Sequence, residues 1–245
     1  MAPTRIVSLV PSWTELLVAL GARDRLVGRT KFCTEPAALT QDVPAIGGTK
    51  NPDIEKILAL RPDLVIANKE ENRREDIEAL EQAGLSVLVT DPNSVGEAIA
   101  CIREIGLSIG EHEATNALAV EIETVLREPS RAIPVRVYVG VWHNPKMGLG
   151  SESYGHSMLE ACGGVNVLAG RPRYPEVTMD ELRALQPELI LLPDEPFPFD
   201  AGHAALYGEI ALAKVIDGKL LWWYGPRMPH SMRELRRILA EAADR

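Results

Sequence analysis

The side chains best suited to binding a ligand are aromatic residues that lie in loops. The chain has 12 aromatic residues, and all but Tyr138 fall in or beside predicted loops or at the ends of predicted strands. Aromatic side chains ordinarily fill cores, whereas rings placed in loops can stack on a flat ligand. The alternative, in which these rings only cap sheet ends and pack loops, stays open. At least three of the following residues are expected to contact a ligand: Trp13, Phe32, Trp142, Tyr174, Trp223 and Tyr224.

Basic side chains occur in the same loops, at Lys31, Lys50, Arg171, Arg173 and Arg227. The chain as a whole is acidic, with 26 Lys and Arg against 35 Asp and Glu and a formal net charge of −9. A local reversal of charge suits a ligand with carboxylate, phosphate or catecholate oxygens, although exposed cations also serve solubility. The overall negative charge would repel a phosphate backbone, so no nucleic-acid partner is expected.

Metal-binding and catalytic patterns are weak. His143, His230 and Cys33 could converge on a transition metal, but no two of the five histidines have the spacing of one helix face. No bound metal and no resident cofactor are therefore expected. Phosphate-binding glycine loops, a G-x-S-x-G elbow and H-E-x-x-H are absent from the sequence, so no catalytic residue is assigned and the chain is expected not to be an enzyme. The Ser12 hydroxyl, at a predicted helix start, could hold an anion or simply cap the helix.

The elements that would position these residues repeat along the chain. Residues 54–71 and 179–196 align without gaps at an offset of 125. Each copy predicts an amphipathic helix, a turn and a short buried strand of the parallel type. Further strands are predicted over residues 6–10, 86–91, 135–141 and 219–225, and helix starts at Ser12, Ser94, Thr178 and Ser231, where Glu follows three residues later. The repeated order of strand and helix predicts an α/β fold with two Rossmann-like lobes and parallel sheets.

A long helix is predicted between the lobes. Residues 111–127 contain no Gly or Pro and keep apolar side chains on one face, and Gly106 and Gly110 are expected to separate this helix from the one before it. The predicted organisation is an amino-terminal lobe over residues 1–110, a bridging helix over 111–128 and a carboxyl-terminal lobe over 129–245. Ligands of parallel sheets bind beyond the carboxyl ends of the strands, so the predicted ligand site is the cleft between the lobes.

The composition and the amino terminus bear on location. The chain is 46% hydrophobic, enough for a globular core, and no stretch approaches the roughly 20 apolar residues of a membrane span. The amino terminus, MAPTRIVSLVPSW, shows neither a signal-peptide core nor a lipid-attachment cysteine. As written, the sequence predicts a cytoplasmic protein.

Several motifs follow one another in a recognisable order: VPSWTELLVALG, KFCTEP, ALRPDLVIA and EACGGVNVLAG. Together they resemble the helical-backbone receptors for cobalamin, haem and ferric siderophores, which are substrate-binding components of ABC importers. The resemblance covers nearly the whole chain and implies a class III periplasmic-binding-protein fold, with a periplasmic or cell-surface location as the family norm. It also places Cys33, within a Cys-x-x-Pro loop, along the cleft. Familiar cobalamin receptors carry tryptophans where this chain has Thr49, Lys50 and Asn68, so the resemblance does not single out cobalamin.

The resemblance further implies a docking role for two acidic residues. Glu70 and Glu195 are equivalent across the 125-residue offset, and each follows the buried strand of its copy. In family importers an acidic residue on each lobe docks onto arginines of the membrane permease. Ordinary solvated surface carboxylates are the alternative.

The sequence therefore predicts a non-catalytic binding protein for a corrinoid, haem or ferric-siderophore-type ligand. Two alternatives stay open: a cytosolic carrier or sensor of a metal chelate or tetrapyrrole without a transporter, and an enzyme acting on a small anionic metabolite in the same cleft. The expected partners are the small-molecule ligand and an ABC permease, and the chain is expected to be monomeric. The predicted ligand contacts are Ser12, Trp13, Lys31, Phe32, Cys33, Lys50, Asn68, Trp142, His143, Arg171, Tyr174, Trp223, Tyr224 and Arg227.

Overall fold

The computed structural model describes residues 2–129 and 134–244, and it divides into two compact α/β units. The first unit comprises residues 1–91, 97–120 and 224–226, and the second comprises residues 92–96, 121–223 and 227–245. The fold class predicted from the sequence, two α/β lobes with parallel sheets, is confirmed. Within the described residues, no helix combines the length and the apolar character needed to cross a bilayer.

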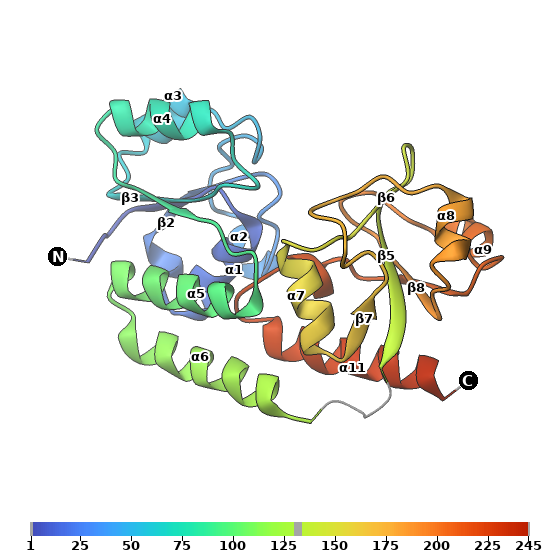
Figure 1. Ribbon diagram of the computed structural model, residues 1–245. Coiled ribbons are helices and arrows are strands. Elements are labelled where there is room, and N and C mark those ends of the chain that lie inside the picture. Colours follow the sequence, from blue (N-terminus) through green and yellow to red (C-terminus); the bar gives the residue numbers. More distant parts are fainter. Residues whose placement is uncertain (1, 130–133, 245) are drawn as a thin grey trace. The chain divides into compact units, whose positions relative to one another are not determined.

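The first unit is built on a four-stranded parallel sheet with the strand order β2-β1-β3-β4. Figure 1 shows α3 and α4 on one side of this sheet and α1 and α5 on the other. Every residue of β3 is buried, as its continuous apolar run predicted. The strands are β1 (Ile6–Ser8), β2 (Leu26–Arg29), β3 (Leu64–Asn68) and β4 (Val87–Thr90). The helices are α1 (Pro11–Ala19), a short 3-10 turn (Arg23–Arg25), α2 (Ala37–Thr40), α3 (Ile54–Ala59), α4 (Arg74–Gln82), α5 (Val95–Ile109) and the first part of α6 (His112–Arg127).

The second unit repeats this plan. Its parallel strands have the order β7-β5-β8-β9, and a short strand, β6, pairs antiparallel with the carboxyl end of β5. Helices α8 and α9 lie on one side of the sheet, and α7 and α11 lie on the other (Figure 1). The strands are β5 (Val135–Trp142), β6 (Met147–Gly148), β7 (Gly164–Asn166), β8 (Leu189–Pro193) and β9 (Leu212–Ile216). The helices are α7 (Tyr154–Ala161), α8 (Met179–Ala184), α9 (Ala201–Tyr207), α10 (Lys219–Trp222) and α11 (Met228–Ala243).

The two copies of the repeat share backbone geometry as well as sequence. Arg61 and Gln186, which are 125 residues apart, follow the carboxyl ends of α3 and α8, and both adopt a left-handed conformation with φ of 44° and 48°. In each unit an arginine at the start of the first strand donates hydrogen bonds to carbonyl oxygens at that helix end: Arg5 immediately precedes β1, and Arg136 is the second residue of β5. These bonds satisfy carbonyl groups that a helix end leaves without a partner. The internal duplication is therefore present in three dimensions.

Some local predictions were wrong. Residues 219–225 do not form a strand, because Lys219–Trp222 is helix α10 and the edge strand β9 comes earlier. Of the four predicted capping boxes, Thr178 with Glu181 is present at α8. Helix α1 begins at Pro11 and α11 at Met228, so Ser12 and Ser231 lie inside their helices. In each case a proline in the first turn, where a missing N–H costs nothing, starts the helix earlier than the serine.

The long helix predicted over residues 111–127 is α6 (His112–Arg127). Gly110, with φ of +79°, separates it from α5. Gly106 has a different role from the one predicted, since it lies within α5, and a Cβ atom there would overlap the Thr115 side chain on α6. The boundary between the two units falls within α6. A bridging function for this helix and the domain limits at residues 110 and 128 stay predictions.

Candidate ligand-binding site

In the first unit, the loop after β2 carries an exposed aromatic ring. Phe32 is 51% exposed, and the Lys31 ammonium lies 5.0 Å from the centre of its ring. Gly48 lies beside this ring, where a Cβ atom would make an ordinary 3.4 Å contact with it, but the same Cβ atom would lie 2.4 Å from the Asn51 side-chain oxygen. An exposed ring beside a cation, beyond the carboxyl end of a parallel strand, is suited to a flat anionic ligand.

Other residues predicted to bind ligand lie inside the first unit. Trp13 is fully buried, its indole N–H donates to the Thr90 hydroxyl over 2.9 Å, and its ring centre is 4.6 Å from that of Tyr224, which is also buried. Asn68 is buried as well, and its side-chain oxygen accepts from the backbone amides of Glu70 and Glu71. These side chains are buried and make contacts within the protein. Contact of any of them with a ligand stays a prediction.

The two small polar side chains of this group are also buried. Cys33 shares a 3.1 Å hydrogen bond with Thr30, and burial raises the pKa of its thiol. A protonated thiol is a poor metal ligand. The Ser12 hydroxyl is buried without a hydrogen-bond partner among the described residues. Lys50 is exposed, and its ammonium donates to the Glu70 carbonyl over 2.6 Å.

The second unit presents an aromatic cluster at the carboxyl end of β5. Trp142 is the last residue of β5 and is 41% exposed. Its ring packs edge to face against the ring of Phe197, with 5.3 Å between the ring centres. Behind this pair, the His143 ring lies 4.6 Å from that of His203 and 5.8 Å from that of Phe197. The buried rings of Phe199 and Tyr207 complete the cluster.

The two histidines of the cluster differ in their partners. His203 lies on α9 and its Nδ1 is 2.7 Å from a carboxylate oxygen of Asp200, which caps the same helix. The His203 hydrogen bonds lower the pKa of Asp200. His143 Nδ1 is buried without a partner among the described residues, and burial, followed by the charge of His203, lowers the His143 pKa. Both effects favour the neutral form of the His143 imidazole.

Trp223 is held by charged groups of its own unit. Its indole N–H donates to the Glu195 carboxylate over 2.8 Å, while the Lys219 ammonium and the Arg227 guanidinium lie 5.4 and 4.8 Å from its ring centre. Glu195 is half-buried, and burial raises the pKa of its carboxyl. Gly218 makes this position possible, because a Cβ atom there would lie 2.5 Å from Glu195 Cγ. Glu195 therefore differs from a freely solvated surface carboxylate.

The loop after β7 brings together the remaining predicted residues. Arg171 pairs with Glu181 over 3.3 Å and donates to the Glu176 carbonyl. The Arg173 guanidinium lies 5.6 Å from the ring centre of Tyr174, which is half-buried. Several of the predicted cations thus bond to protein groups, which lowers the positive charge that they can offer a ligand.

The structure also identifies residues that the sequence analysis did not single out, namely Phe197, His203 and Asp200. The loop Asp194–Phe199 follows the carboxyl end of β8, where parallel sheets bind ligands. The two phenylalanines in its sequence FPF were the signal from which these residues could have been found. Across residues 2–129 and 134–244, no group of three or more His, Cys, Asp or Glu side chains could hold a metal ion. Cys33 belongs to the first unit and His143 and His230 to the second, so the convergence of these residues considered from the sequence stays untested.

Comparison with known proteins places the chain in a family. Residues 6–195 match the family described as periplasmic binding protein. The vitamin B12-binding protein of Yersinia pestis (strain Pestoides F) is 24% identical over 196 residues, which cover 78% of this chain and 70% of that protein. The periplasmic vitamin B12-binding protein BtuF of Vibrio cholerae has a TM-score of 0.84 at 21% identity, and the periplasmic haem-binding protein BhuT, in complex with two haems, has 0.85 at 27%; each match covers 99% of both chains. This chain belongs to the periplasmic binding protein family.

Proposed function

We propose that this chain is the non-catalytic substrate-binding component of an ABC importer. Its ligand, on this proposal, is a flat metal macrocycle, a corrinoid or haem, or a ferric siderophore. The named relatives bind vitamin B12 or haem, and the match with the haem-binding protein extends over 99% of both chains.

The observation that carries the proposal is the exposure of Trp142 at the carboxyl end of β5. Tryptophan is usually well buried, and here the Phe197 contact fixes its ring while 41% of the residue stays open to solvent. A rigid exposed indole is suited to stacking on a macrocycle, because little conformational entropy is lost when the ligand covers it. In the first unit, Phe32 is 51% exposed after the carboxyl end of β2, so that unit also offers an open ring.

Charge favours an acidic ligand. Lys31 is exposed beside Phe32, and its ammonium could pair with a propionate, a phosphate or a catecholate oxygen. Arg171 could exchange its solvent-exposed pair with Glu181 for a ligand carboxylate at low cost, since surface ion pairs contribute roughly 0–1 kcal/mol. These two residues support haem or a siderophore over an uncharged ligand.

Docking of a permease at Glu70 and Glu195 is part of the same proposal. The two residues are equivalent by the repeat, but their settings differ. Glu195 accepts a hydrogen bond from Trp223, whereas Glu70 lies in the turn held by Asn68. An arginine approaching Glu195 would offset the desolvation of its carboxylate, so charge-assisted pairing there is favoured. Exchanging each glutamate for glutamine should weaken permease binding while leaving ligand affinity unchanged.

The proposal places the working protein outside the cytoplasm, where importers capture their ligands. The cytosolic carrier and the enzyme are the competing hypotheses. Fractionation of the native organism tests location: recovery of the protein only in the cytosol, with no permease bound, would favour the carrier. Recovery of a chemically altered ligand after incubation would favour the enzyme.

The direct test is a thermal-shift and absorbance screen against cyanocobalamin, cobinamide, haem and ferric siderophores. A ligand at 100 times its Kd should stabilise the folded state by about 2.7 kcal/mol, which a melting curve detects readily. A shift with one of these ligands, accompanied by a change in its absorbance spectrum, is the expected result. No shift with any of them would contradict the proposal.

A further inference from the structure

We infer that Arg173 is a positioning residue that couples the loop over residues 171–174 to the segment that begins α5. The inference rests on the proposed function, because it takes this loop as part of the ligand site. Arg173, Asn93 and Glu152 together form the Arg173 clamp. All three belong to the second unit, which includes residues 92–96.

The clamp is made by one guanidinium nitrogen that bonds to two other segments. Arg173 Nη1 donates to the side-chain oxygen of Asn93 over 2.9 Å and to the carbonyl oxygen of Glu152 over 2.8 Å. The same guanidinium lies 5.6 Å from the ring centre of Tyr174, its neighbour in the loop. A ligand contact that holds the loop in place at Tyr174 would therefore also hold both hydrogen bonds.

The backbone of the clamp is strained. Glu152 and Arg173 both adopt left-handed conformations, with φ of 58° and 59°. Such a conformation is unfavourable for a non-glycine residue and persists only where the surroundings impose it. Here the Arg173 amide donates to Ser151 O and its carbonyl accepts from Gly150 N, each over 2.7 Å. Backbone strain of this kind, held by polar contacts, is a common property of segments that respond to ligands.

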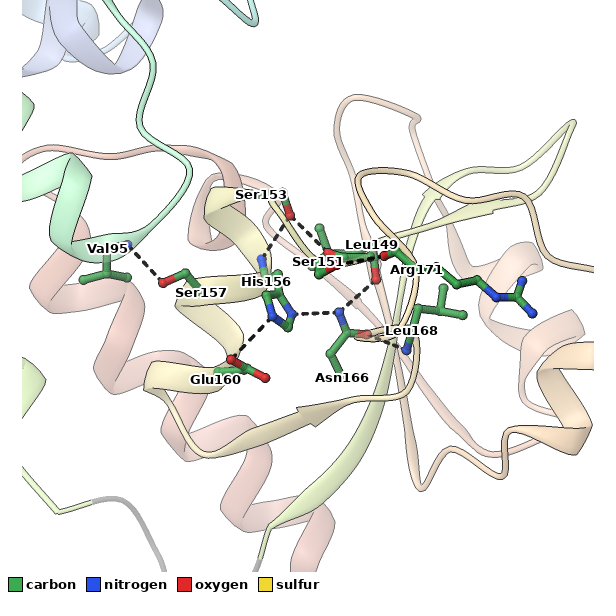
Figure 2. A network of polar contacts seen from close by, with 11 residues as sticks. Val95, Leu149, Ser151, Ser153, His156, Ser157, Glu160, Asn166, Leu168 and Arg171 are labelled. Atoms are coloured by element: carbon green, nitrogen blue, oxygen red, sulfur yellow. Dashed lines mark hydrogen bonds and ion pairs between the residues drawn. The ribbon is translucent and has the colours of Figure 1, made fainter.

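A second polar contact holds the same segment on α7. The Val95 amide donates to the Ser157 hydroxyl over 3.1 Å, as Figure 2 shows. The neighbouring residue on α7, His156, has its Nδ1 3.0 Å from the Asn166 amide nitrogen, which also donates to Leu149 O over 3.0 Å (Figure 2). This network joins α7, the end of β7 and the chain just before Gly150.

The segment that begins α5 is therefore held by two hydrogen bonds. One joins Val95 to Ser157 on α7, and the other joins Asn93 to Arg173 in the loop over residues 171–174. If a bound ligand favours the clamped arrangement, it must also favour the anchored segment, and the anchored segment must in turn favour the ligand. A side chain that only supported the fold would change stability without this linkage.

The experiment measures ligand affinity and amide exchange together, with haem and cyanocobalamin used in turn as the probe. In the wild-type protein, a saturating ligand should slow hydrogen exchange at Val95. Asn93→Ala should bind the ligand about fivefold or more weakly, which is the lower end of typical coupling between sites. It should also lose the ligand-dependent slowing at Val95. Arg173→Lys should behave similarly, because one ammonium cannot reproduce the planar donor geometry of the guanidinium.

Arg183→Ala is the matched control, since Arg183 is a paired surface arginine on α8 of the same unit. It should leave both readouts at the wild-type values. Binding by Asn93→Ala with wild-type affinity and undiminished slowing at Val95 would overturn the inference and leave the proposed function intact. If the wild-type protein binds neither haem nor cyanocobalamin, a ferric siderophore found in the thermal-shift screen takes their place as the probe; failure to bind any of these ligands would overturn the proposed function and this inference with it. If Arg173→Lys fails to fold, Asn93→Ala alone decides the matter.

Discussion

Replacing Trp142 by alanine should weaken ligand binding while leaving the second unit folded. A tryptophan buries at most about 250 Å², so the 41% that is exposed corresponds to about 100 Å² that a stacked ligand could cover. At about 25 cal/mol per Å² this area contributes up to about 2.5 kcal/mol, or about 70-fold in Kd. Trp142→Phe should lose only part of this, because a smaller ring can keep the edge contact with Phe197.

The assay is a titration followed by ligand absorbance, with a urea unfolding curve for each variant. Leu107→Ala is the matched control, since Leu107 is an exposed apolar residue, 66% accessible, on α5. The control should bind with wild-type affinity. A Trp142→Ala protein that unfolds at the wild-type urea concentration and binds within twofold of wild type would refute the stacking argument.

Three further predictions concern stability. Gly218→Ala should lower the free energy of unfolding by about 1–3 kcal/mol, because the new methyl group would press on Glu195; an unchanged urea midpoint would contradict this. Trp13→Phe should lower the free energy of unfolding by about 3 kcal/mol through lost volume and the lost bond to Thr90; an unchanged urea midpoint would contradict the structural role of this indole. Burial raises the Glu195 pKa, so the folded state binds this proton more tightly than the unfolded chain, and stability falls as pH rises from about 4.3 through the raised value. Glu195→Gln, which can still accept from Trp223, should remove that contribution, so its stability relative to wild type should increase from pH 4 to pH 7 in urea melts.

Regular elements were predictable where local sequence alone carries the signal. The apolar runs of β3 and β8 and the repeat that contains them were visible because a buried parallel strand needs a continuous apolar stretch. Helix α6 was visible from one apolar face without breakers. Residues 219–222 were wrongly predicted as a strand and form helix α10. A short apolar run has no periodicity that distinguishes a strand from a helix, so its conformation depends on the tertiary contacts around it.

The candidate site was less predictable than the elements that carry it. The sequence placed Trp13, Trp142 and Trp223 equally in loops or at strand ends, but the structure buries Trp13, exposes Trp142 and fixes Trp223 between charged groups. Sequence position specifies which strand end a side chain occupies. It does not specify what covers that side chain, and exposure determines whether a ring can meet a ligand.

From the sequence alone, the two-lobed parallel α/β fold, its duplication and the resemblance to importer binding proteins could be determined, because each depends on patterns that repeat along the chain. Only the tertiary structure showed that Trp142 packs against Phe197, that Glu195 accepts a hydrogen bond from Trp223 and that Arg173 donates one to Asn93. The hydrogen bond between Trp223 and Glu195 joins residues 28 positions apart, and the one between Arg173 and Asn93 joins residues 80 positions apart. Such pairings follow from how the sheet and its loops close in space, and no local period or motif encodes them.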